Sequence, residues 1–249
     1  MDKLQSELLT PRYELLPFKG QKTENEWDSI PSGATVTVTS SQKTGQERTI
    51  ERAEYLVGTD KDLTVIPHLS ARAIESADQL DDILGRLDQA KIDSAFIVGG
   101  DAKDTPEKPF HNSLDLIQAI RDRRTSDELE LGCTAYPDGH ADISRELLKQ
   151  DLLDKQHLVG YCATQLCFSP RKITKWSHEM QAAGLEIPII VGIPGSVERK
   201  KLLRIVSQVG ISDTTSFLRK NLPLMTQFIM PGGYSPDRLI KGLQSQIAD

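Results

Sequence analysis

The chain has 249 residues, of which 27% are charged and 38% are hydrophobic, and its formal net charge is −6. The length suffices for one large core, while the negative charge disfavours nucleic acid as the main partner. No apolar run approaches the roughly 20 residues of a membrane helix, which argues against a membrane span. The first residues lack a long apolar stretch and a small-residue cleavage site, so we expect a cytoplasmic protein without a secretory signal.

Seven short apolar runs predict β-strands, because most are rich in β-branched or aromatic residues and bounded by Gly or Pro. The runs are residues 13–17, 35–39, 63–69, 95–98, 131–136, 161–168 and 187–193. Three cysteines, Cys133, Cys162 and Cys167, lie in apolar segments. Their odd number and surroundings indicate reduced thiols, and their spacing does not match a zinc site.

Between most of these runs, apolar residues recur at helical spacing. The predicted helices lie at residues 74–90, 114–120, 143–148, 173–183, 197–206 and 235–247. In the last of them, Ser235 is expected as the N-cap and Pro236 as the first helical residue.

Strand–helix alternation predicts an α/β fold with a parallel sheet covered on both faces. No linker, repeat or low-complexity tract divides the chain, so we expect one domain over residues 1–249. The length fits a (β/α)8 barrel of the TIM type. A doubly wound fold is the rival, but no Gly-x-Gly-x-x-Gly follows the first strand. We therefore favour the barrel, in which seven strands are recognisable and either an eighth strand is irregular or the last strand is missing.

Active sites of such barrels lie at the carboxyl ends of the strands, where this chain carries several polar residues. Glu14 and Gln165 are the most informative, because a polar side chain inside an apolar strand is costly unless it is paired. Glu14 is expected either to act as a general acid with a raised pKa or to pair with Arg12 or Lys19. Gln165 is expected either to bind a heterocycle edge or to be a satisfied core residue.

The histidines and glycines at other strand ends extend this set. His68 alone would more often be structural, whereas His140 on a Gly-containing loop is a better functional candidate. Residues 192–196, Gly-Ile-Pro-Gly-Ser, predict either an anion-binding nest or a plain turn. The sequence has no metal cluster and no Gly-x-Ser-x-Gly elbow, so the polar residues suit a flat, hydrogen-bonding ligand better than a covalent intermediate.

Taken in order, these motifs resemble the methylenetetrahydrofolate reductase family from Tyr13 to about Asn221. The matching pieces are Tyr-Glu-Leu-Leu-Pro at 13–17, Val-Thr at 38–39, Pro-His-Leu at 67–69, Gly-Asp at 100–101, Ala-Tyr-Pro-x-x-His at 135–140, Thr-Gln at 164–165 and Gly-Ile-Pro-Gly at 192–195. The resemblance implies reduction of 5,10-methylenetetrahydrofolate to 5-methyltetrahydrofolate by NADH or NADPH through FAD, in one-carbon metabolism and methionine synthesis. Many members form homo-oligomers, although nothing in this sequence identifies an interface.

The resemblance also implies roles for single residues. Glu14 matches a glutamate that assists protonation of the folate, and Asp101 matches an aspartate that tunes the electrostatics near pterin and flavin. Gln165 matches a pterin contact. The positions implied in cofactor binding are Thr39, Ser40, His68, Gly99, Gly100, Asp101, Tyr136, His140 and Lys155.

Three departures from the family pattern motivate alternatives. Gly99 stands where many members have arginine, Lys155 is the only remnant of the flavin-phosphate contacts, and Arg199 replaces an aromatic that packs on nicotinamide or folate in some members. Arg199, like Gln165, is expected to bind the substrate. The three departures motivate an alternative, a flavin-independent reductase of the same substrate. The missing last strand motivates a third alternative, a folate-binding protein without turnover.

Overall fold

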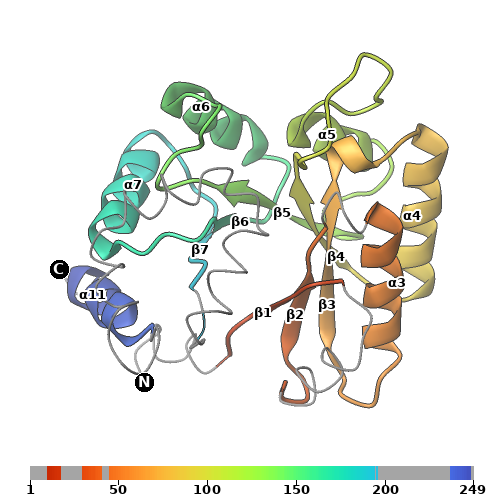
Figure 1. Ribbon diagram of the computed structural model, residues 1–249, viewed down its shortest axis with the longest axis horizontal. Coiled ribbons are helices and arrows are strands. Elements are labelled where there is room, and N and C mark those ends of the chain that lie inside the picture. The colour runs from red at the N-terminus through yellow and green to blue at the C-terminus, as the bar shows by residue number, and fades with distance from the viewer. Residues whose placement is uncertain (1–9, 18–29, 41–44, 194, 196–235, 248–249) are drawn as a thin grey trace. The chain divides into compact units, whose positions relative to one another are not determined.

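The computed structural model describes residues 10–17, 30–40, 45–193, 195 and 236–247. Within these ranges, seven parallel strands follow one another in chain order across the sheet (Figure 1). They are β1 (Tyr13–Leu15), β2 (Thr35–Val38), β3 (Thr64–Ser70), β4 (Ser94–Val98), β5 (Glu130–Ala135), β6 (Tyr161–Thr164) and β7 (Ile189–Ile190). Each strand overlaps its predicted run, which confirms the α/β class and the barrel-type parallel sheet.

Helices connect most of these strands. The helices are α3 (Gly45–Val57), α4 (Ala77–Gln89), α5 (Ser113–Arg121), α6 (Arg145–Lys155), α7 (Pro170–Ala182) and α11 (Asp237–Ile247), with a 3-10 turn η1 (Ala71–Ala73) after β3. Side-chain caps fix three of the starts, because Ser76, Asn112 and Ser169 each accept a hydrogen bond from the backbone three residues on. The predicted helix at 197–206 and the predicted cap Ser235 lie outside the described residues.

Two differences from the predicted elements have local causes. Helix α3 was not predicted, because its apolar positions Ile50, Ala53 and Leu56 stand among charged residues. Strand β6 ends at Thr164 rather than at residue 168, and the next residue, Gln165, uses its Oε1 atom to accept a hydrogen bond from the Leu166 amide. Such a local side-chain bond competes with continued strand pairing.

The chain divides into two compact units by its internal contacts. Unit 1 comprises residues 1–134 and 154–161, and unit 2 comprises residues 135–153 and 162–249. The single domain over residues 1–249 stays a prediction. All helices in the described ranges are too short or too polar to cross a membrane.

Unit 1 contains strands whose two faces differ sharply. In β2 to β5, one face carries only apolar side chains: Val36, Val38, Val65, Pro67, Leu69, Ala95, Ile97, Leu131, Cys133 and Ala135. Helices α3 and α5 pack next to β3 and β4, and Figure 1 shows α3 and α4 along one side of β2–β4. The polar side chains of these strands all fall on the other face, because alternate residues of a strand point to opposite sides.

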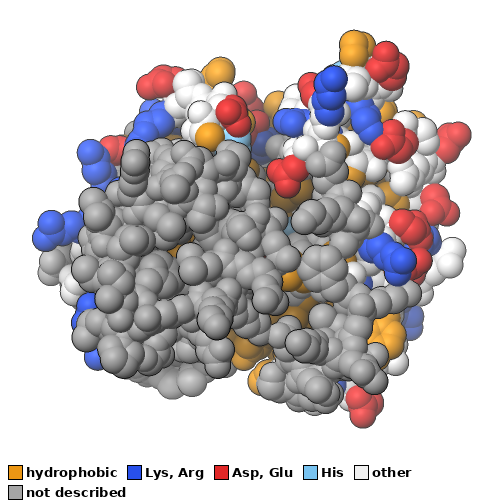
Figure 2. Space-filling model, viewed as in Figure 1, with side chains coloured by type: hydrophobic (Ala, Val, Ile, Leu, Met, Phe, Trp, Pro, Cys, Tyr) orange, Lys and Arg blue, Asp and Glu red, His pale blue; other side chains and the backbone are white. Residues whose placement is uncertain are grey.

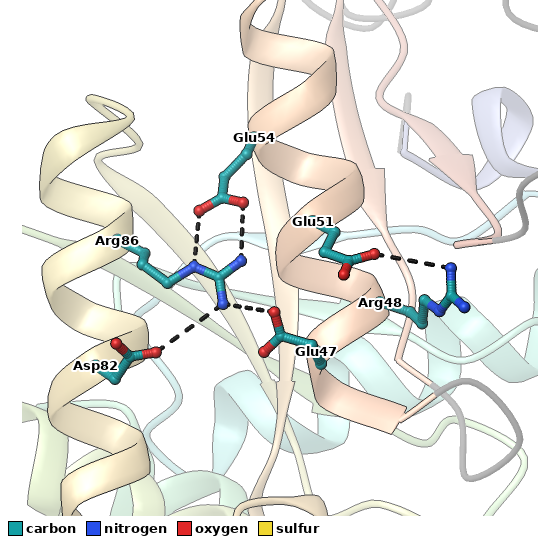
Figure 3. A network of polar contacts seen from close by, with 6 residues as sticks. All are labelled: Glu47, Arg48, Glu51, Glu54, Asp82 and Arg86. Carbon is teal, nitrogen blue, oxygen red and sulfur yellow. Dashed lines mark hydrogen bonds and ion pairs between the residues drawn. The ribbon is translucent and has the colours of Figure 1, made fainter.

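An ion-pair network joins helices α3 and α4 (Figure 3). The Arg86 guanidinium donates two hydrogen bonds of 2.8 Å to the Glu54 carboxylate and one of 2.7 Å to Glu47, and Asp82 lies 4.0 Å away. The hydrogen bonds from Arg86 lower the pKa of Glu54. In the view of Figure 2, acidic and basic side chains are interspersed over the described surface.

Unit 2 has a small core between α7 and α11. Cys167, Ile173, Leu239 and Leu243 are buried together, and Gly242 lies so close to Pro170 that an added Cβ would stand 2.5 Å from the proline Cγ. The cysteines Cys133, Cys162 and Cys167 are free and buried, as predicted. Burial raises the pKa of both Cys162 and Cys167 to about 12, so both thiols are protonated at neutral pH.

Arg86→Met should destabilise the protein by about 1 kcal/mol in urea unfolding, because it removes the bidentate pair with Glu54 and the contact with Glu47. The lowered pKa of Glu54 stabilises the folded state above the ordinary carboxyl pKa. The cost of the substitution should therefore shrink as the pH falls through the pKa of folded Glu54. The matched control is Arg48→Met, which removes only an exposed 3.8 Å pair with Glu51. An equal effect of both substitutions would contradict this account of the network.

Candidate functional site

The strand register of unit 1 gathers the predicted residues of β1 to β3 on one surface. Glu14 pairs with Thr37, and His68 pairs with Phe96, which in turn pairs with Gly132. Because Thr37 also pairs with Ile66, two residues before His68, all of these positions share one face. We call this polar surface of β1–β5 the site face. It is opposite the wholly apolar face.

Glu14 is a solvent-accessible carboxyl in the middle of β1. Among the described residues it has no ion-pair or hydrogen-bond partner, and partial desolvation by the surrounding protein raises its pKa. The alternative pairing with Arg12 is not found, because the Arg12 guanidinium lies over the Tyr161 ring, 4.5 Å from its centroid. Lys19 lies outside the described residues. An accessible carboxyl with a raised pKa can deliver a proton to a ligand.

His68 forms part of a neutral aromatic layer on the site face. Burial lowers the pKa of His68 to about 4, so its imidazole is uncharged at neutral pH. Its ring lies 4.8 Å from the Phe96 ring, and Phe96 in turn stacks on Tyr161 at 6.1 Å. Gly132 makes room for this layer, since a Cβ there would stand 2.3 Å from the Tyr161 ring. All three rings are buried and the Arg12 guanidinium covers Tyr161, so contact of His68 with a cofactor stays a prediction.

Thr39 and Ser40 follow β2 and already have hydrogen-bond partners. The Thr39 hydroxyl donates to the Leu15 carbonyl at 3.2 Å, and its own carbonyl accepts from Thr49 at 3.0 Å. The Ser40 hydroxyl donates to Gln46 Oε1 at 3.4 Å. Both residues therefore hold β1, β2 and α3 together at the carboxyl end of the strands, and cofactor contact by either stays a prediction.

Gln46 is a residue of this site that the sequence analysis missed. Its side chain is buried, with Nε2 donating to the His68 carbonyl and Oε1 accepting from the Ser70 amide, both at 2.9 Å. The Gln46 side-chain amide thus satisfies two backbone groups at the end of β3, as a neighbouring strand would. The sequence signal for Gln46 would have been its place in the first turn of α3, a helix that was not predicted.

The segment Gly99–Asp101 follows β4 and contains one sterically required glycine. Gly100 has φ +87°, and a Cβ there would lie 1.9 Å from Ser70 Oγ and 3.3 Å from Ser70 Cβ. A Cβ on Gly99 would meet only Arg72 Nη2, at 3.9 Å. Asp101 is exposed, and it has no partner among the described residues. The loop thus presents a free carboxylate beside a close approach of two backbone segments.

Three predicted site residues lie in unit 2. Tyr136 is half-buried and meets the His140 ring edge-on at 5.5 Å, while His140 Nδ1 accepts from the Asp142 amide at 3.2 Å. Gln165 is exposed, so it is not a core glutamine. Its Nε2 has no hydrogen-bond partner among the described residues, which leaves a donor for a ligand.

The remaining predicted positions are less informative. Lys155 has only 2% of its surface exposed at the end of α6, so its ammonium is not presented to solvent, and its contact with a flavin phosphate stays a prediction. Arg199 lies outside the described residues, as do two members of the 192–196 segment. Gly192 approaches the Thr164 carbonyl so closely that a Cβ would lie 2.5 Å away. Over the ranges that the structure describes, no three metal-ligating side chains come together.

The sequence of this chain is similar to one family of known proteins. A family profile described as Methylenetetrahydrofolate reductase matches residues 18–221. Methylenetetrahydrofolate reductase 1 of Schizosaccharomyces pombe is 28% identical over 145 residues, which cover 55% of this chain and 24% of that protein. Methylenetetrahydrofolate reductase 2 of Saccharomyces cerevisiae is 30% identical over 91 residues, which cover 35% and 15%. The matches thus span about a quarter or less of these relatives.

Among solved structures, oxaloacetate acetylhydrolase in complex with oxalate is similar with a TM-score of 0.50 and 10% identity, covering 96% of this chain and 90% of that one. At this identity the similarity concerns the fold alone, and it agrees with the barrel-type architecture.

Gly100→Ala should destabilise unit 1 by about 2 kcal/mol or more, because it forces a side chain into a left-handed backbone and against Ser70. Gly99→Ala is the matched control and should change stability by less than about 0.5 kcal/mol, since the space is open. Urea unfolding of both variants tests this. Similar stabilities of the two variants would show that the close approach at Gly100 is not as described.

Proposed function

The chain belongs to the methylenetetrahydrofolate reductase family, and we propose that it reduces 5,10-methylenetetrahydrofolate to 5-methyltetrahydrofolate with NADH or NADPH. The observation that carries this proposal is Glu14, an accessible carboxyl that has no partner among the described residues and whose pKa is raised by desolvation. The reduction needs an acid that protonates the folate so that its one-carbon unit becomes an electrophile. A carboxyl that keeps its proton to a higher pH suits this role better than an ordinary glutamate.

Asp101 and Gln165 complete the proposed set of folate-binding groups. Asp101 contributes a free carboxylate beside Gly100, which would stabilise positive charge that develops on the substrate. Gln165 contributes a free amide donor next to its bonded Oε1, which suits the alternating donors and acceptors of a pterin edge. Each role is a proposal that rests on the family and on the exposure of the side chain.

FAD is the cofactor that the family implies, and the described residues fit it only in part. The His68 ring is uncharged, as contact with a flat ring system would favour, but it and its aromatic neighbour Phe96 are buried. Of the contacts to that ring that the family implies, His68 and Gly100 belong to unit 1, and Tyr136 and His140 belong to unit 2. When bound, FAD would accept a hydride from the nicotinamide and pass it to the folate. The chain's own part is to orient the reactants and to hold a proton on Glu14.

A second candidate is direct hydride transfer from the nicotinamide to the folate without a flavin. The burial of Lys155 favours it, because that lysine was the only expected remnant of the flavin-phosphate contacts. Turnover by flavin-stripped protein would support direct transfer, and strict dependence on added FAD would exclude it. Folate binding without turnover, both in flavin-stripped protein and with added FAD, would support the alternative of a folate-binding protein.

Glu14→Gln should slow folate reduction by about 10²- to 10⁴-fold and leave the reaction of the enzyme with NAD(P)H nearly unchanged, because only the folate step needs the proton. Stopped-flow measurement of the two half-reactions tests this. In the wild type, folate reduction should fall as the pH rises through the raised pKa of Glu14, and the variant should lose this dependence.

The control is Glu146→Gln, an exposed glutamate in the first turn of α6. It should match the wild type in both half-reactions. Equal losses in the two half-reactions of Glu14→Gln would show that Glu14 supports the whole site rather than protonating the folate.

A further inference from the structure

Arg72 is held rigidly at the carboxyl end of β4 by three backbone carbonyls of unit 1. It lies in the η1 turn after β3, and its amide donates to the Gly99 carbonyl at 3.1 Å. Its Nε donates to the His111 carbonyl at 3.0 Å, and its Nη1 donates to the Ala102 carbonyl at 3.5 Å. The guanidinium is therefore oriented before any ligand arrives.

The charge of Arg72 is not neutralised in its setting. Its side chain is half-buried, and no carboxylate among the described residues pairs with it, although Asp101 is only two residues beyond Gly99. Backbone carbonyls fix the direction of a guanidinium without cancelling its charge. A partly desolvated charge without a counter-charge is costly for a structural residue, whereas it is expected where an anion binds.

One edge of the guanidinium faces open space. Its Nη2 has no hydrogen-bond partner among the described residues, and it lies 3.9 Å from the position that a Cβ on Gly99 would occupy. Apart from Gly99 itself and its chain neighbours, no other atom of the described residues stands within 4 Å of that position. Gly99 is also where the family resemblance leads us to expect arginine. Here Arg72, in the turn after β3, brings a guanidinium beside that position.

We propose that Arg72 binds an anionic oxygen group of a ligand, a nucleotide phosphate or a folate carboxylate, in the space above Gly99. The choice of these two sources rests on the proposed function. A planar guanidinium with a free Nη2 suits either group, because both present paired oxygens to two N–H donors.

The test compares the affinities of wild type and Arg72→Gln for three separate probes: NADPH, FAD and 5-methyltetrahydrofolate. Loss of the charged contact should raise the Kd of at least one probe about 10- to 100-fold. An effect on NADPH or FAD assigns the phosphate, and an effect on 5-methyltetrahydrofolate assigns the carboxylate. Adding Gly99→Arg to Arg72→Gln should recover much of the lost affinity, because it returns a guanidinium to the same space.

Arg48→Gln is the matched control, since it removes an exposed arginine of α3 and should leave all three Kd values unchanged. If Arg72→Gln fails to fold, Gly99→Val replaces it, because the valine fills the open space while Arg72 stays in place. Kd values within about twofold of wild type for every probe, in whichever of these variants folds, would overturn the proposal.

Turnover of the wild type is measured in parallel, because it distinguishes a failure of the proposed role of Arg72 from a failure of the proposed reductase function. Active wild type with unaffected variants overturns the role of Arg72 alone. Probe binding that depends on Arg72, without turnover, overturns the proposed function alone. A wild type that binds none of the three probes overturns both.

Discussion

The parallel register of β1–β5 is the constraint on which the rest of unit 1 depends. It aligns Glu14 with Thr37 and aligns His68 with Phe96 and Gly132, so that the polar side chains share one face. A shift of one residue in any strand would exchange the two faces and bury its polar side chains against the helices. The wholly apolar opposite face, packed next to α3 and α5, makes such a shift costly. The site face is thus positioned by the same burial that stabilises the fold.

The electrostatic character of the site face follows from this placement. Desolvation shifts two ionisable groups of the site face toward the neutral form, since it lowers the pKa of His68 and raises that of Glu14. The site face therefore carries an uncharged imidazole at His68 and a carboxyl at Glu14 that keeps its proton to a higher pH. The charges at its edge, Asp101 and Arg72, belong to segments that follow β4 and β3. Both are without an ionic partner among the described residues, which fits a role in binding a ligand.

The sequence was a good guide where the information is local and a poor one where it is not. Apolar runs located all seven strands, and caps such as Ser76 and Ser169 mark helix starts. The helix α3 was missed because its apolar stripe is narrow. Gln46 and Arg72 could not be recognised, because their contacts join segments more than 20 residues apart, as in the bonds from Gln46 to His68 and from Arg72 to His111. Glu14 was predicted as polar in an apolar strand, but only the structure excludes its pairing with Arg12.

The central claim is that the site face of unit 1 is where the folate is reduced. A crystal structure of the protein with bound 5-methyltetrahydrofolate tests this claim most directly. We expect the pterin ring on the site face, with the Glu14 carboxyl within hydrogen-bonding distance of it. A pterin bound elsewhere, with Glu14 in contact with water alone, would contradict the account.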